Sequence, residues 1–171
     1  MKRMHKCLVL ILSITVLISS CKSSDDSSST DTCPSSDVSF LAVGASGTLL
    51  TSADGTCWTA RTSGTTNNLR ALAYDGSGTT VMVGYSGTIL TSSDNITWTS
   101  RTSGTTEHIT NVTYSGSAFV ATGASGTILG SSDGITWADR TSSCGMTENM
   151  WAISIGSSVA VTAGDNGTIY T

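Results

Sequence analysis

The side chains that could catalyse a reaction or bind a metal are few, and most of them belong to a repeat. Asp54, Asp94 and Asp133 lie 40 and 39 residues apart, each two residues after a serine and next to Gly or Asn. An aspartate in this setting is typical of a tight turn, because its carboxylate can bond backbone amides two residues on. Carboxylates on different repeat units are too far apart to share one cation. We therefore interpret these aspartates as turn-forming residues and expect no metal site and no cofactor.

Each of these aspartates lies between two predicted strands. The run 87–91 before Asp94 and the run 96–99 after it are rich in β-branched and aromatic residues, which favour strands. Trp98 follows the turn, and Trp58 and Trp137 are its copies. We predict that this tryptophan is the largest buried side chain of each unit, because burial of an indole removes about 150–250 Å² from water.

Two more series repeat with the same period of about 40 residues. One is a hairpin turn with two glycines at 44–50, 84–90, 123–129 and 164–170, and the other is a strand at 69–74, 109–114 and 150–155. Together with the strands on either side of the aspartate, a complete unit has four short strands, the content of one β-propeller blade. We predict an all-β fold of four-stranded antiparallel blades over residues 37–171.

The number of strands leaves the predicted propeller incomplete. The first unit has the last three strands of a blade, two complete units follow, and the last unit ends after its third strand. The resulting 14 strands, about 3.5 blades, close no ring of four to eight blades. The chain is then a truncated gene product, an open arc, or half of a homodimer whose two copies would hold 28 strands, as many as seven blades. Of these alternatives we favour truncation.

The composition of the chain indicates its fold class, and its net charge limits the kinds of partner it can bind. With 38% hydrophobic and 12% charged residues, 18 glycines and one proline among 171 residues, the chain is expected to form one all-β domain. Five basic and twelve acidic residues follow residue 20, a net charge of −7. This charge argues against nucleic acid as a partner.

The first 36 residues are predicted to direct the protein to a membrane. Residues 1–20 combine a basic start with the short apolar run 7–18, which is typical of a signal peptide. The run Ile18-Ser19-Ser20-Cys21 resembles the bacterial lipobox, which implies that Cys21 carries the lipid anchor; a chance cysteine after an ordinary signal peptide is the alternative. Residues 21–36 are then the lipidated cysteine and a disordered Ser/Asp-rich tether. By resemblance to a sorting rule of enteric bacteria, Lys22 implies export to the outer membrane of the cell envelope.

The turns resemble the Asp-box, or BNR repeat, whose usual form is S-x-D-x-G-x-T-W. Here the copies are one residue shorter, with Asn95 in place of Gly and Cys57 in place of Thr. The surrounding sequence SGTILTSSDNITWTSRTSGTT at 86–106 is similar to bacterial propellers of the photosystem II stability or assembly factor-like family. This resemblance implies a β-propeller over about residues 39–171 and leaves the function open, because such repeats occur in enzymes, adhesins and assembly factors.

Asp-box sialidases use an arginine triad, a Tyr–Glu nucleophile pair and an acidic Asp, so the resemblance directs attention to the arginines and glutamates. Three arginines lie three residues after the repeat tryptophan and are interpreted as contacts around it: Arg61, Arg101 and Arg140. After the predicted signal peptide, Arg70 is the only arginine outside this series. Glu107 and Glu148 both lie in loops that lead into an opening strand, and His108 beside Glu107 is interpreted as solvated surface. We therefore expect that the chain is not an enzyme.

Three cysteines follow the tether start, so one internal disulfide at most can form. We prefer the pair Cys33 and Cys57, because both belong to the incomplete first unit, and Cys144 is then left over.

Two functions remain open. In the first, the variable loops 67–68, 107–108 and 143–149 line one face of a non-catalytic module that contacts a protein or a glycan. In the second, the chain is a fragment of a glycoside-acting, sialidase-like enzyme whose catalytic residues lie on blades that are absent here. A photosynthetic role is a third hypothesis from the resemblance alone. The expected partners are a membrane, through the lipid anchor, an unknown protein or glycan, and a second copy of the chain.

Overall fold

A computed structural model of the protein describes residues 38–141, 145–156 and 159–171. The predicted signal peptide and tether, with Cys21 and Cys33, lie outside the described residues, as does Cys144. The described part is built from strands joined by short loops and by three short 3₁₀ turns, η1 (Ala45–Gly47), η2 (Ala124–Gly126) and η3 (Asp165–Gly167).

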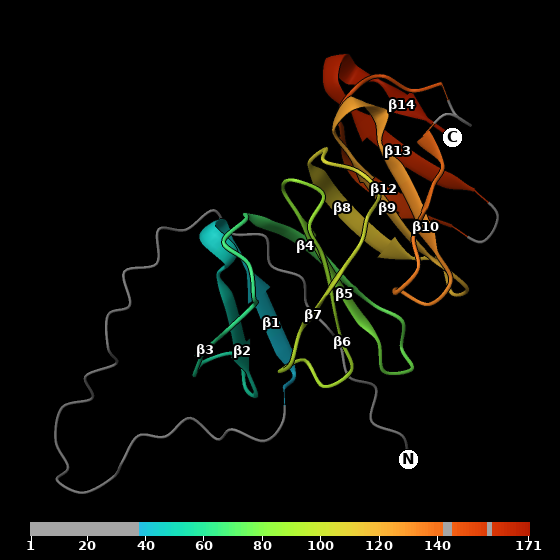
Figure 1. Ribbon diagram of the computed structural model, residues 1–171. Coiled ribbons are helices and arrows are strands. Elements are labelled where there is room, and N and C mark those ends of the chain that lie inside the picture. Colours follow the sequence, from blue (N-terminus) through green and yellow to red (C-terminus); the bar gives the residue numbers. More distant parts are fainter. Residues whose placement is uncertain (1–37, 142–144, 157–158) are drawn as a thin grey trace, which may run out of the picture.

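Fourteen strands form four antiparallel sheets that follow one another along the chain (Figure 1). The first sheet contains β1 (Phe40–Val43), β2 (Leu49–Ser52) and β3 (Thr59–Arg61). The second contains β4 (Leu69–Tyr74), β5 (Thr80–Gly84), β6 (Ile89–Ser92) and β7 (Thr99–Arg101). The third contains β8 (Ile109–Tyr114), β9 (Phe119–Gly123), β10 (Ile128–Ser131) and β11 (Ala138–Asp139). The fourth contains β12 (Met150–Ile155), β13 (Ala160–Gly164) and β14 (Ile169–Tyr170).

The predicted strand content is confirmed, with sheets of three, four, four and three strands. Figure 1 shows the first and the last sheet at opposite ends of an unclosed array. Two copies of this chain would together hold the 28 strands counted from the sequence. The three-stranded end sheets are separate layers, the first without an inner strand and the fourth without an outer one, so two copies would contribute eight sheets.

The turn between the second and third strand of each unit is a tight hairpin with two residues in the left-handed region. In the first unit Ser46 and Gly47 have φ of 53° and 71°, and the Thr48 N–H donates to Ala45 O over 3.0 Å. Positive φ at both central residues is the mark of a type I′ turn, which favours Gly and Asn. The same pair is Ser–Gly in the second and third units and Asn–Gly in the fourth.

The core lies between the sheets. Alternate residues of β5 face opposite neighbours, so Val81 and Val83 pack toward the third sheet while Met82 packs toward the first. Both faces of the second sheet are therefore buried, which explains why Val81, Met82 and Val83 form an uninterrupted apolar run in β5. The boundary between the third and fourth sheets contains buried threonines: Thr110 donates to Met150 O, and the Thr122 hydroxyl is buried without a partner.

The prediction that the repeat tryptophans are the largest buried side chains is wrong. Trp98 and Trp137 are only partly buried against the core clusters, and Trp58 is 37% exposed. The largest fully buried side chain among the described residues is Phe119. The reason is position: each tryptophan directly precedes the short outer strand, so its indole covers the rim of the core and does not enter it.

We predict that Gly87→Ala destabilises the protein by about 3 kcal/mol and that Gly104→Ala costs about 1 kcal/mol, as measured by urea denaturation. Both glycines have positive φ, which disfavours alanine. A Cβ at Gly87 would also lie 2.0 Å from Thr105 O, whereas a Cβ at Gly104 would meet nothing within 4 Å. Equal losses for the two variants would mean that the close approach at Gly87 does not exist.

Candidate functional site

Antiparallel pairing sends successive loops to opposite ends of each sheet, so the array has two distinct faces. We call one the loop face; it comprises the turns 44–48, 85–88, 124–127 and 165–168 and the loops 62–68, 102–108 and 145–149. We call the other the Asp-box face; it carries the loops 53–58, 93–98 and 132–137. The loops that vary between units, at 67–68, 107–108 and 145–149, therefore lie on the loop face together with the repeated Ser–Gly turns, and the Asp-box loops lie on the opposite face.

On the Asp-box face each aspartate closes its own loop. Asp94 Oδ1 accepts the backbone N–H groups of Ile96 at 2.8 Å and Thr97 at 2.7 Å, and it also accepts the Ser92 hydroxyl at 2.9 Å. Ser92 Oγ in turn accepts the Asn95 N–H at 2.8 Å. The corresponding bonds recur around Asp54 and Asp133. The carboxylate thus satisfies local backbone donors, as expected for a turn-forming residue.

These bonds favour the charged carboxylate. The backbone N–H groups of Thr97 and Ile96 lower the pKa of Asp94 to about 2. The pKa values of Asp54 and Asp133 are lowered for the same reason, by the amides of Cys57 and Thr56 in one loop and of Thr136 and Ile135 in the other. A carboxylate held ionised in this way suits a structural role better than proton transfer near neutral pH.

The three loops differ in how they hold their tryptophan. Trp58 Nε1 donates to Gly55 O over 3.2 Å, and Trp137 Nε1 donates to Gly134 O over 2.9 Å. In the second loop Asn95 replaces the glycine, and both Asn95 Oδ1 and Trp98 Nε1 are buried without a partner. The departure from the repeat pattern at Asn95 therefore costs one hydrogen bond.

The repeat arginines do not bond the tryptophans as predicted. Arg61 Nε donates to Thr51 Oγ1 over 3.0 Å, and Arg101 Nε donates to Thr91 Oγ1 over 2.8 Å. In the third unit the threonine position is Gly130, and Arg140 is exposed. The side chains of Arg61 and Arg101 therefore bond the outer strand to its neighbour within one sheet.

On the loop face one residue at each of the three junctions between sheets clasps the two neighbouring sheets. Asn68 Oδ1 accepts the N–H of Ser46 in the preceding sheet at 2.9 Å, and Asn68 O accepts the N–H of Tyr85 at 2.9 Å. His108 and Asn149 occupy the same position in the next two units, and we call the three the clasp residues. Their side chains accept the N–H groups of Ser86 at 3.1 Å and of Ser125 at 3.0 Å.

His108 lies on the exposed surface, as predicted, and it also adds an aromatic stack to this clasp. Its ring lies parallel to Tyr85, with centroids 4.1 Å apart and planes 4° apart, and the Arg70 guanidinium lies 5.6 Å from the centre of the Tyr85 ring. Arg70 forms no ion pair with the described residues. Tyr85 therefore lies in contact with both Arg70 and His108. The sequence did not indicate a role for Tyr85, but an alignment of His108 with Asn68 and Asn149 could have identified the clasp position.

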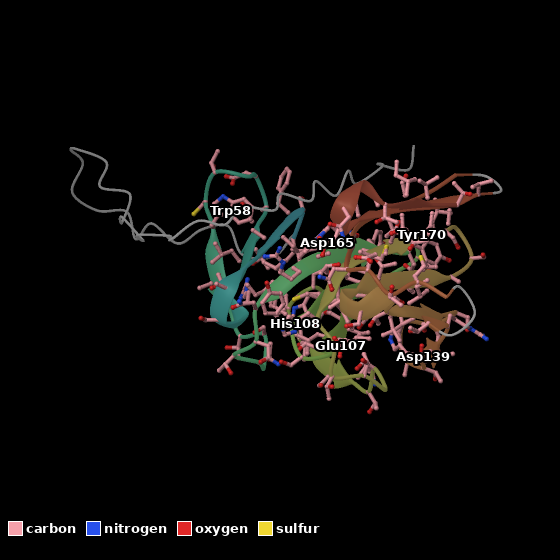
Figure 2. The ribbon with its side chains drawn as sticks, turned by 90° about the horizontal axis from the view of Figure 1, so that it is seen from above. Trp58, Glu107, His108, Asp139, Asp165 and Tyr170 are labelled. Carbon is pink, nitrogen blue, oxygen red and sulfur yellow. The ribbon has the colours of Figure 1, made fainter. Side chains whose placement is uncertain are left out.

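The glutamates of the loop face bond turn residues. Glu107 Oε2 accepts the Ser125 hydroxyl at 3.1 Å, and Glu148 Oε2 accepts Asn166 Nδ2 at 3.2 Å. On the last sheet Trp151 Nε1 donates to Asp165 Oδ1. Figure 2 shows Glu107 and His108 near the middle of the array, with Trp58 on the first sheet at one end.

An open groove of about 720 Å³ adjoins the loop face between the first and second sheets. Its lining is mostly Ser, Thr and Gly from the two identical RTSGTT segments at 61–66 and 101–106, with Asn67 and Arg101. The groove is polar and shallow, and it is a surface for hydrogen bonding more than for enclosing a small molecule.

Further features bear on the predicted sites. Cys57 is disulfide-bonded, and its predicted partner Cys33 lies outside the described residues, so that pairing stays a prediction. The described ranges contain no group of three or more His, Cys, Asp or Glu side chains that could hold a metal ion. They also contain no helix with the length and apolar character needed to span a membrane.

No family model matches the chain, and no curated protein matches it. Among solved structures, YCF48 from Cyanidioschyzon merolae superposes with a TM-score of 0.59, covering 75% of this chain and 48% of that chain at 18% identity. The chain has the fold of YCF48. YCF48 is a β-propeller and a photosystem II assembly factor, so the predicted resemblance is confirmed at the level of the fold. The chain spans about half the length of this YCF48.

A second structure, YCF48 bound to D1 peptide, has a TM-score of 0.38 and 14% identity, and covers 76% of this chain and 61% of that chain. The first comparison, at 18% identity, establishes the architecture alone.

We predict that the protein loses stability as the pH falls from about 4 to about 2, and that Asp94→Asn weakens this dependence. The folded state lowers the pKa of Asp94 below its ordinary value of 3.8 to about 2, so the stabilisation is complete above the unfolded pKa and is lost as the pH falls through the folded one. At neutral pH Asp94→Ala should cost about 1 kcal/mol, because two amides lose their acceptor, and Asp94→Asn should cost less. Chemical denaturation at a series of pH values measures both effects. The same acid dependence in Asp94→Asn and wild type would contradict this role.

Proposed function

We propose that this chain is a non-catalytic scaffold whose loop face binds a protein partner, with Arg70, Tyr85 and His108 at the centre of the contact. The observation that carries the proposal is the stack itself. It joins side chains from two sheets, and in the part of the chain that the structure describes it occurs in one unit only. It also lies on the face that carries the variable loops. A repeat array needs no such stack to fold, since Asn68 and Asn149 clasp their sheets without one.

The chemistry of the stack suits a protein surface. His108 Nδ1 accepts a backbone N–H, so in the neutral ring the proton lies on Nε2 and is available to an acceptor. Arg70 is a cation without a carboxylate partner in the described residues. Tyr, Arg and other large side chains that are already fixed are typical of contact centres, because little conformational freedom is lost when a partner binds.

A non-catalytic role is supported by the way the candidate catalytic residues are used. Glu107 and Glu148 bond turn side chains, and Arg61 and Arg101 bond threonines within their sheets. Among the described residues, Arg70 and Arg140 are the two arginines that make no such bond, whereas a sialidase-like triad needs three. The sialidase-like alternative therefore has no support in this part of the chain.

We further propose that the scaffold is held at the bacterial envelope, on the outer membrane, by a lipid on Cys21. The lipobox-like run before Cys21 and the polar tether after it motivate this proposal. The tether would let the domain reach a partner beyond the membrane surface.

Photo-crosslinking in cells tests the binding face. A photoreactive amino acid at Ser125, exposed on the loop face, should yield a discrete protein adduct, and the same probe at Ser132, exposed on the Asp-box face of the same sheet, should not. His108→Asn copies the clasp residue of the other units, so it should keep the fold and reduce the adduct at least about tenfold by removing the stacked ring. An adduct of equal yield from both positions, or one unchanged by His108→Asn, would contradict the proposal.

Detergent partitioning tests the anchor. The mature protein should enter the detergent phase of a Triton X-114 separation, because more than one acyl chain anchors a protein stably. Cys21→Ser should move it to the aqueous phase while leaving the fold intact. A wild-type protein in the aqueous phase would remove the lipid anchor from the proposal and leave the binding face untouched.

A further inference from the structure

The last sheet presents an apolar face that no described residue covers. Val161 on β13 is 39% exposed and Ile169 on β14 is 68% exposed, and Ala152 and Ala163 beside them are exposed as well. In the second sheet the residues in the same register are Val81, Ile89, Ala71 and Val83, and all four are buried by the third sheet. The face therefore has the composition of a sheet-to-sheet contact, and no sheet of the described residues packs against it. We call it the trailing face.

The first sheet presents the complementary surface. Ala42 on β1 and Leu50 on β2 are partly exposed, whereas Met82 and Leu90, in the same register of the second sheet, are buried against the first. We call this surface the leading face. In the second and third sheets the corresponding face packs against the preceding sheet.

We propose that the trailing face of one copy packs on the leading face of a second copy, and that the reciprocal contact closes a two-chain ring of eight sheets. The contact continues the packing that already occurs within the chain, where the same two kinds of face meet between the first and second sheets and between the second and third. Neither face carries a charged residue at these positions, so their union desolvates no ion.

Symmetry and size agree with a second copy as the occupant. Two different faces that meet head to tail close after one repetition if the rotation is suitable, and the two contacts are then equivalent by a twofold axis. Four sheets per chain give eight in the ring, which lies within the known range of four to eight blades. The YCF48 neighbour extends beyond the matched region by about as much chain again, since only 48% of it is covered. A second copy would provide a similar amount.

Light scattering after size-exclusion chromatography measures the mass directly, on the full chain with Cys21→Ser to prevent acylation. Wild type should have twice the chain mass, and Ile169→Asp and Leu50→Asp should each reduce the mass to that of one chain. Ile135→Asp is the matched control, because Ile135 is 48% exposed on the Asp-box face and should leave the dimer unchanged. A mixture of Ile169→Asp and Leu50→Asp should regain dimer mass through one of the two contacts, because the intact trailing face of Leu50→Asp can pack on the intact leading face of Ile169→Asp. This also shows that both variants are folded.

Three results would overturn the proposal. A monomeric wild type would mean that the faces are covered by something other than a second copy. An open series of larger assemblies would mean that the head-to-tail contact does not close. A Leu50→Asp variant that remains dimeric would mean that two trailing faces pair with each other.

Discussion

The structure depends on the close backbone contact between the Ser–Gly turn of one sheet and the loop that leads into the next. The Gly87 N–H donates to Glu107 O over 2.8 Å, and the Gly126 N–H donates to Glu148 O over the same distance. A side chain at either glycine would collide with a backbone carbonyl, of Thr105 or Met146, at 2.0 Å. Because each unit of a repeat array contacts only its neighbours, this contact sets how every sheet is placed relative to the one before it.

The same contact explains why function is expected on one face only. The clasp residues add side-chain bonds to the turn contact, so the loop face is held rigidly by two sheets at once. A rigid backbone allows one position to vary without loss of the fold, and His108 with its stack on Tyr85 is such a variation. On the Asp-box face the three loops that repeat in sequence close on themselves through Asp54, Asp94 and Asp133.

The sequence predicted the features that arise from short-range chemistry and periodicity. The strands, the turns and the division into three, four, four and three strands follow from patterns that each unit carries locally. Contacts between units were not predictable in this way. The contacts of His108 were not predicted, because its partners Ser86 and Tyr85 lie about one half-unit earlier in the chain. The tryptophans were predicted to be buried, because the sequence does not show how far each indole enters the core.

The sheets are not equally secured. Apolar clusters join the first three sheets, whereas buried threonines occupy part of the boundary of the fourth. A gradient of local stability is therefore expected, highest in the second and third sheets.

Hydrogen exchange measured by NMR tests the central role of the turn contact most directly. The amides of Gly87 and Gly126 should exchange as slowly as those of β5 and β9, because their bonds break only when two sheets separate. The amides of Gly64 and Gly104, in loops where nothing approaches the glycine, should exchange quickly. Fast exchange at Gly87 and Gly126 would contradict the account, because the turn contact would then not set how the sheets are placed.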